Sequence, residues 1–291
     1  MERSGYARLS LARADFHREL IAERTLVVDD KGVASNADSS QRFSREAALA
    51  IATQLGAGIG GVKLDGQRAG SQFEGSVRTF IARTLPLFSM LRPARWAVEN
   101  VGSSRKGYHL ARFEPYRHLA ELAQMVDESP TLAAVLGNAY DVSPDVIVIR
   151  LPVPDSEINS TNILVDGQYG VLSPIRQANQ SHGIVHAVVS CKWTLRSDRA
   201  QNARTEALGV LRNRKGRAPH IAVVTGEPSP ARIASLALGT GDVDTVYHFA
   251  LPELVAATAA LDNDESQSIL ETLISGKRLR DIADLPLDLC V

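Results

Sequence analysis

The chain has 291 residues, of which 44% are hydrophobic and 22% are charged, and this composition is typical of a soluble globular protein. No stretch approaches the roughly 20 consecutive apolar residues of a membrane span, and the first residues lead into no apolar signal segment, so we expect a cytoplasmic protein without membrane contact. Two cysteines exclude a disulfide framework, and a net charge of −1 argues against a protein that coats nucleic acid non-specifically.

The first quarter of the chain is predicted to be mainly helical. Apolar residues recur at helical spacing over residues 6–24, which indicates a first amphipathic helix. Residues 25–28 suggest a short strand. Ser44 is expected to cap a second helix, which Gly56 should end in a left-handed conformation.

A glycine-rich segment and a long helix come next. Residues 56–70 contain six glycines, so the backbone there can approach a ligand closely, but the segment lacks the ending of a phosphate-binding loop. Residues 71–91 have the apolar stripe of a helix, which Pro86 should bend or break. On the residues alone, Glu74 is interpreted as a surface glutamate near the start of this helix.

The middle of the chain leads to a first core strand. Residues 98–113 suggest a hairpin around positions 103–107, and two helices are expected over 115–126 and 129–139. Residues 145–151 then form a continuous apolar run, as expected of a strand that is covered on both faces.

Strands and helices alternate in the remainder. Within a polar connection, a short strand is expected over 162–165, and residues 184–192 are expected to form the second core strand. After it we expect helices over 198–213, 230–237, 251–261 and 265–274, and strands over 220–224 and 243–249. This alternation predicts an α/β fold with a central mixed β-sheet flanked by helices, and the absence of a linker predicts a single domain over residues 1–291.

Three ionisable residues are candidates for metal-dependent phosphodiester hydrolysis. Such chemistry needs a divalent metal, an activated water and positive charge near the phosphate. Asp145 at a strand start can supply a metal ligand, Lys192 on the neighbouring strand can orient or help deprotonate the water, and Glu206 can add a second carboxylate. Ser190 shares a face with Lys192 because the two are two residues apart. Taken singly, Asp145 is better explained as a strand cap, Lys192 as an exposed lysine at a strand end and Glu206 as a member of an ion pair. Together the three residues favour a metal-dependent active site.

The segment around these residues is strongly basic. Residues 192–217 hold eight basic side chains against two acidic ones, a net charge of +6. Most charge runs are solvated helix surfaces. Here, however, Arg196, Asp198 and Arg199 stand at a helix start, where arginines can bind guanine and a carboxylate can accept from cytosine. The segment is therefore a candidate reader of G·C pairs, with an intrahelical ion-pair cluster as the alternative.

The spacing of the candidate residues resembles a known family. Pro144-Asp145, 46 intervening residues, Lys192, 13 intervening residues and Glu206 resemble the permuted PD-(D/E)xK site of restriction endonucleases that cut around a CCGG core. The segment from Ser190 to Arg199 is similar to that of the NgoMIV-type members, and the resemblance covers nearly the whole chain. It implies a restriction-endonuclease-like fold.

The resemblance also implies roles for individual residues. Asp145 and Lys192 would be catalytic, Glu206 and Ser190 would complete the Mg²⁺ site together with the carbonyl of Cys191, and an upstream glutamate would match Glu74. The positions that would contact DNA are Arg196, Asp198 and Arg199 for the inner CCGG, Asp38 and Arg232 for the outer G·C pair, and Ser40 and Gln67 in the minor groove.

The implied activity is that of a type II restriction endonuclease. The expected target is GCCGGC in double-stranded DNA, cut after the first G to leave a 5′ CCGG overhang with 5′-phosphate ends. A homotetramer built as a dimer of dimers is implied, as is a cognate methyltransferase that acts on the same site.

Two other hypotheses remain open from the sequence. In the first, the protein is a sequence-specific DNA-binding module that has lost catalysis, and the presence of Asp145, Lys192 and Glu206 together speaks against it. In the second, the protein is a small-molecule enzyme that binds a phosphorylated ligand through residues 56–70 or the turn at 225–226. The second hypothesis leaves the arginines at 196 and 199 unexplained.

Overall fold

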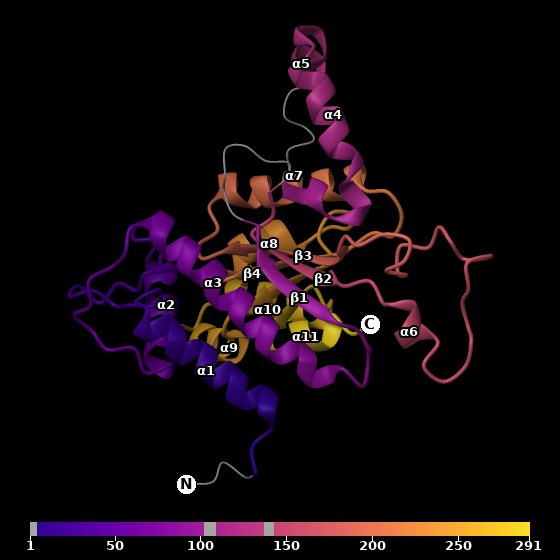
Figure 1. The fold of residues 1–291 in the computed structure, drawn as a ribbon. Helices are drawn as coiled ribbons and strands as arrows, with labels where there is room; N and C mark the ends of the chain where they lie inside the picture. The colour runs from indigo at the N-terminus through magenta and orange to yellow at the C-terminus, as the bar shows by residue number, and fades with distance from the viewer. Residues whose placement is uncertain (1–4, 102–108, 137–142) are drawn as a thin grey trace.

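The computed structural model describes residues 5–101, 109–136 and 143–291. Within these ranges the centre is a six-stranded sheet in which the order of the strands follows the order of the chain. The first three strands pair antiparallel: β1 (Trp96–Asn100), β2 (Val146–Arg150) and β3 (Ile184–Lys192). From β3 onward the pairing is parallel, through β4 (His220–Thr225), β5 (Thr245–His248) and β6 (Leu279–Asp281). The sheet is therefore mixed and flanked by helices, as predicted (Figure 1).

The helices pack around this sheet in two groups. Helix α3 runs along β1, β2 and β3 with α1 packed on it, whereas α8, α9 and α10 pack together near β5 and β6. The α-helices are α1 (Arg8–Ala22), α2 (Arg42–Gln54), α3 (Gly66–Thr84), α4 (His118–Asp127), α5 (Pro130–Leu136), α6 (Asp155–Ile158), α7 (Ser197–Asn213), α8 (Pro230–Ala237), α9 (Leu251–Ala260), α10 (Asp264–Ser275) and α11 (Leu285–Asp288). Short 3₁₀ turns in the described residues are Leu85–Phe88, His109–Arg112, Glu114–Tyr116 and Ile282–Asp284. In the described part of the chain, no helix combines the length and apolar character that crossing a membrane requires.

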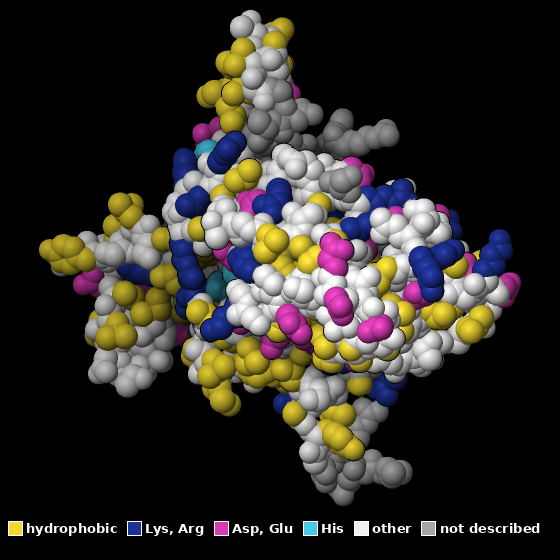
Figure 2. All heavy atoms as spheres, turned by 180° about the vertical axis from the view of Figure 1, so that it is seen from behind, with side chains coloured by type: hydrophobic (Ala, Val, Ile, Leu, Met, Phe, Trp, Pro, Cys, Tyr) yellow, Lys and Arg dark blue, Asp and Glu magenta, His cyan; other side chains and the backbone are white. Residues whose placement is uncertain are grey.

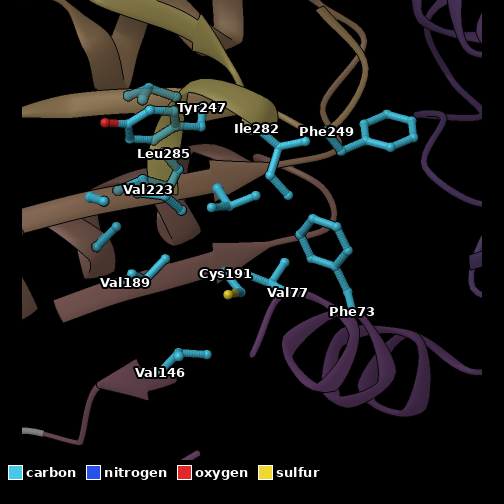
Figure 3. Packing of buried hydrophobic residues seen from close by; sticks show 14 of the residues in the cluster. Phe73, Val77, Val146, Val189, Cys191, Val223, Tyr247, Phe249, Ile282 and Leu285 are labelled. Carbon is cyan, nitrogen blue, oxygen red and sulfur yellow. The ribbon is translucent and has the colours of Figure 1, made fainter. Parts of the chain in front are cut away.

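One apolar core holds α3 against the middle of the sheet. The first four residues of β2 are fully buried, which explains why their sequence is continuously apolar rather than alternating. Phe73 and Val77 of α3 point toward the sheet, with Val77 beside Cys191 of β3 (Figure 3), and the centroid of the Phe73 ring lies 4.9 Å from that of Trp193. This packing fixes the start of α3 beside the end of β3.

Several predicted elements are confirmed. Strand β3 and helix α8 have the expected bounds. Gly56 follows α2 with a φ of +84°, the left-handed conformation that glycine adopts without strain. Helix α3 gives way to a 3₁₀ turn that contains Pro86, because proline has no N–H to continue the helical hydrogen bonding.

Two predictions for the N-terminal part are wrong. Residues 25–28 form no regular strand, and Val28 makes only isolated bridges to Ala34 and Ile59. Ser44 does not cap α2, which begins at residue 42 after Gln41. The Ser44 hydroxyl instead accepts the backbone N–H of Asp38 at 2.8 Å, so it anchors the preceding loop.

Two predictions for the middle of the chain are also wrong. β1 does not pair within a local hairpin over 98–113 but with β2, about fifty residues later, while positions 103–107 lie outside the described residues. Residues 162–165 form no strand, because the Asn159 side chain binds the backbone of Leu164 and Val165 and replaces strand pairing. The short strand β6 was not anticipated.

Residues 155–183 project from the body between β2 and β3, and we call this segment the arm (Figure 1). Its base is organised by Arg176, whose side chain is 5% exposed. The guanidinium pairs with Asp155 at 2.7 Å and donates to the carbonyls of Asp166, Tyr169 and Gly170. Large apolar side chains of the arm remain in solvent, with Ile163 86% and Leu172 93% exposed. Figure 2 shows hydrophobic side chains gathered on this projection, at the left of the view.

Candidate active site

A cleft of about 470 Å³ opens at the edge of the sheet where β2 begins and β3 ends. Three segments line it: the first turns of α3 with Gln67 and Glu74, the entry to β2 with Asp145, and the stretch from Cys191 into α7 that includes Arg199. Residues that are far apart in the sequence therefore meet in one hollow.

The strand register brings Asp145 to the end of β3. Val146 pairs with Val189, so the residue before β2 falls opposite Ser190. The Asp145 Oδ2 atom accepts the Cys191 N–H at 2.7 Å and the Lys192 Nζ at 2.9 Å, and the Ser190 hydroxyl lies 3.3 Å away. Asp145 and Lys192 are thus brought together as predicted.

Glu206 joins this pair from α7. Its Oε2 atom lies 3.2 Å from the Ser190 hydroxyl, which therefore sits between the carboxylates of Asp145 and Glu206. The single hydroxyl hydrogen can serve only one of the two acceptors. Burial, followed by the nearby charge of Asp145, raises the pKa of Glu206 to about 7.

Lys192 is held as a cation. Burial by itself lowers the pKa of this amine, but the charges of Asp145 and Glu206 outweigh that effect, and the pKa of Lys192 is raised above its ordinary value. In this arrangement Lys192 is suited to orienting a water or a phosphate oxygen, and less suited to removing a proton.

Glu74 lies in the same cleft, as the family resemblance implied and in contrast to the surface position that the residues alone suggested. Helix α3 begins at Gly66, earlier than predicted, so Glu74 stands more than two turns inside it. Burial and the charge of Asp145 raise the pKa of Glu74 to about 7. The side chain thus adds a third carboxyl to the environment of Asp145.

The donor set fits a hard divalent cation. Among the described residues, no group of three or more His, Cys, Asp and Glu side chains forms a ready-made metal cage. The cleft instead offers Asp145 and Glu206, whose mutual repulsion a bound cation would relieve, and oxygen ligands of this kind suit Mg²⁺ with its retained waters. The Cys191 thiol is buried, and burial raises its pKa well above the ordinary value, so only the backbone carbonyl of this residue suits such an ion.

The predicted G·C readers lie at the start of α7. Arg196 and Asp198 are exposed. Arg199 lines the cleft and donates to the Thr194 hydroxyl at 2.5 Å. The basic segment therefore contributes Lys192 and Arg199 to the lining of the cleft.

The structure also brings together three of the four residues expected to contact the outer pair and the minor groove. Arg232 of α8 forms an ion pair with Asp38, which also accepts the Ser40 hydroxyl at 2.7 Å and the Ser40 N–H at 2.9 Å. These hydrogen bonds and the Arg232 charge hold the pKa of Asp38 well below its usual range. Gln67 lies apart from this group, in the cleft itself.

The sequence analysis missed one buried carboxylate, which lies beside the residues expected to contact the outer base pair. Glu227 is 0% exposed, and it follows Thr225 at the end of β4. Burial raises the pKa of Glu227 to about 7, although hydrogen bonds from Leu195 N–H and the charge of Arg232 oppose the shift. Its position at the carboxyl end of a parallel strand is the signal that could have identified it, because functional residues gather at such ends.

Comparison with known proteins identifies the family of this chain. The family model described as NgoMIV restriction enzyme matches residues 16–291. The chain belongs to the NgoMIV restriction enzyme family. The type II restriction enzyme NgoMIV of Neisseria gonorrhoeae is 45% identical over 279 residues, which cover 96% of this chain and 97% of that protein. The expected family membership is thereby confirmed.

A solved structure was also found, that of the restriction endonuclease PspGI in complex with its substrate DNA. It is 12% identical, covers 97% of this chain and 92% of its own, and superposes with a TM-score of 0.27. The assignment to the NgoMIV family rests on the two sequence comparisons.

Proposed function

We propose that this restriction endonuclease uses Mg²⁺ to hydrolyse double-stranded DNA at GCCGGC, cutting after the first G to leave a 5′ CCGG overhang. The observation that carries the proposal is the meeting of Asp145, Lys192 and Glu206 around Ser190 in one cleft, with Arg199 at its rim. The membership in the NgoMIV family supports cleavage of DNA by a type II restriction enzyme, and the target is proposed from the resemblance of the Ser190–Arg199 segment.

The residues of the cleft have distinct roles in this proposal. When bound, Mg²⁺ supplies Lewis-acid polarisation of the phosphate and lowers the pKa of a coordinated water. Asp145, Glu206 and the Cys191 carbonyl are the proposed ligands. The Lys192 ammonium, held by Asp145 at 2.9 Å, orients the attacking water and stabilises negative charge that develops on the phosphate. Glu74 adds negative charge beside the ligands, and Ser190 keeps the two carboxylates apart.

The exposed side chains around the cleft are the proposed readers of the DNA. Arg196 and Arg199 can each bind a guanine bidentately and Asp198 can accept from a cytosine amino group, which suits the inner CCGG. We assign the outer G·C pair to Asp38 and Arg232. The minor-groove contacts are assigned to Ser40 and Gln67.

We further propose that the whole chain acts as one domain and assembles as a homotetramer in the cytoplasm. A continuous core that includes residues from α1 to α11 supports the single domain. The exposed apolar side chains of the arm support the assembly, because an apolar projection of this kind is typical of a surface that another subunit covers. A methyltransferase that modifies the same sequence is the expected counterpart in the cell.

Run-off sequencing of digested DNA tests catalysis, target and cut position in one experiment. Plasmid DNA with and without GCCGGC is incubated with the protein and Mg²⁺, with a chelator as control. Discrete fragments that end in 5′-phosphate CCGG overhangs are expected only for DNA that contains the site. Specific retardation of the same DNA in a gel without cleavage would instead support a binding protein that has lost catalysis.

A further inference from the structure

The loop after β4 connects two parts of the DNA-reading surface. The backbone N–H of Gly226 donates to the Lys192 carbonyl at 3.1 Å, and the Gly226 carbonyl accepts the Asn36 side chain at 2.7 Å. A side chain at 226 has no room, because an added Cβ would lie 2.4 Å from the Trp193 ring. The loop is therefore fixed between the end of β3 and the segment that carries Asp38.

Glu227 lies at the centre of this connection. One carboxylate oxygen accepts the N–H of Leu195 at 2.8 Å, and the other accepts the N–H of Ser229 at 3.1 Å. Leu195 directly precedes Arg196, and Ser229 is the residue before α8, three positions ahead of Arg232. The Glu227 side chain thus holds the backbone just before the Arg196–Arg199 segment and just before α8, which carries Arg232.

Glu227 also acts directly on one reader. The Arg232 guanidinium lies 3.8 Å from Glu227 and forms its ion pair with Asp38 through another nitrogen. Arg232 therefore stands between a buried carboxylate and a partly exposed one. Any movement of Arg232 toward a base changes how well the buried charge of Glu227 is compensated.

The backbone hydrogen bonds account for a carboxylate at position 227, but not for the direction of its charge. Both backbone partners are N–H donors, so the side chain must accept with both oxygens, and only a carboxylate does this. Glutamine would turn an amino group toward one of the N–H groups, and aspartate is one methylene shorter. A carboxylate nevertheless carries a charge that is costly to bury. The charge of Glu227 faces Arg232. We take this to indicate that the unfavourable free energy of burying the charge is tolerated because the charge positions Arg232 for recognition.

We propose that Glu227 is a positioning residue for target recognition. Through Glu227, recognition of the inner base pairs by the Arg196–Arg199 segment and recognition of the outer pair by Asp38 and Arg232 become dependent on each other. This inference rests on the proposed function and adds a residue that touches no base. If it holds, damage to one group of readers impairs the other.

The test compares discrimination between DNA duplexes by the full-length protein with Mg²⁺. Three duplexes are used: the proposed target, a duplex with a changed outer pair and a duplex with one changed inner pair. For Glu227→Gln, the ratio of kcat/KM for the target to that for each changed duplex is expected to fall about tenfold, on the scale of one lost base contact. Both ratios should fall together, because glutamine loses one of the two backbone hydrogen bonds and the charge beside Arg232, and the proposed coupling passes the change to the other group.

Glu253→Gln is the matched control. Glu253 is a partly buried carboxylate that forms an ion pair with Arg13 at 2.6 Å, and it does not line the cleft. This variant should lower the melting temperature while leaving both discrimination ratios unchanged. If Glu227→Gln likewise loses only thermal stability and keeps wild-type discrimination, Glu227 is structural and the proposal is overturned.

A second variant decides the question if Glu227→Gln does not fold. Arg232→Lys keeps the positive charge beside Glu227 but lacks the planar fork, so it should weaken discrimination at the inner pairs as well as at the outer pair. Inner discrimination equal to that of the wild type overturns the coupling. The wild type is measured first, and its failure to cut any duplex would refute the proposed function itself, whereas unchanged discrimination in the variants refutes only the role of Glu227.

Discussion

The cleft and the arm differ from an ordinary protein surface in opposite ways, because the cleft holds partly buried carboxylates and the arm exposes large apolar side chains. In the cleft, Asp145, Glu206 and Glu74 are gathered in partly buried surroundings, and burial raises the pKa values of both glutamates to about 7. In the arm, Ile163 and Leu172 stand almost fully in solvent. Each arrangement is unfavourable for the isolated chain, and each is what a partner would relieve: a divalent cation in the first case, a further copy of the chain in the second. The two regions should therefore respond to substitution in separable ways.

The largest effect is expected in the cleft. Lys192→Ala removes the cation beside Asp145, so cleavage should fall by about 10²- to 10³-fold or more, as when one preorganised donor to a developing charge is lost. Binding of the target and the assembly state should persist. The rate is measured by plasmid cleavage and the binding by gel retardation without metal. Lys277→Ala, which removes an exposed lysine outside the cleft, serves as the control, and near-normal cleavage by Lys192→Ala would refute the assigned role.

The arm should give the reverse pattern. The double substitution Ile163→Asp and Leu172→Asp places charges where apolar contacts are proposed, and each lost contact removes roughly 1.5 kcal/mol or more, so assembly should weaken about a hundredfold. Analytical ultracentrifugation should show smaller species. Met90→Asp changes an equally exposed apolar residue outside the arm and should leave assembly intact. A tetramer that survives the double substitution would remove the arm from the interface.

The rim of the cleft should show an intermediate effect. Arg199→Ala removes one proposed bidentate contact to guanine, so specific binding should weaken by about 1–3 kcal/mol, while binding to unrelated DNA changes little. Titrations of target and non-target duplexes at one fixed salt concentration measure this difference. Equal weakening on both duplexes would show that Arg199 contacts only phosphate.

The smallest effect concerns stability. Glu206→Gln should stabilise the metal-free protein by about 1 kcal/mol above pH 7, because it removes a partly buried charge beside Asp145. The pKa of Glu206 rises from 4.5 to about 7 on folding, so between these values the folded state binds more protons and becomes more stable as the pH falls. The advantage of the variant should therefore vanish toward about pH 4.5.

Urea unfolding in the presence of a chelator, at about pH 8 and about pH 5, measures this dependence. Glu253→Gln provides a control of opposite sign: burial raises the pKa of Glu253, but the Arg13 pairing outweighs burial and lowers it overall, so its loss should destabilise the protein at neutral pH. Destabilisation by Glu206→Gln at pH 8 would contradict the expected repulsion in the cleft.

Local sequence patterns predicted the parts of the fold that depend on neighbouring residues. The apolar run that ends at Lys192 defined β3, and the proline at position 230 marked the start of α8. Local sequence patterns failed to predict elements whose pairing partner lies far away in the sequence. The hairpin expected over 98–113 was wrong because β1 pairs with β2, and β6, only three residues long, shows no alternation that a pattern could reveal.

The same distinction applies to the site. Asp145, Lys192 and Glu206 were recognisable because each lies at a defined point of a strand or helix, and their spacing resembles that of a known family. Glu227 also follows a strand end, but no family spacing accompanies it, and its contacts with the backbone N–H groups of Leu195 and Ser229 are visible only in the folded chain. Periodicity carries no information about such contacts.

The order of the strands has a consequence for how the molecule forms. Because β1 to β6 are adjacent in the sheet in the order in which they are synthesised, each strand from β2 onward finds one neighbour already translated. Once β2 has paired with β1, the sheet can therefore grow by successive addition at one edge.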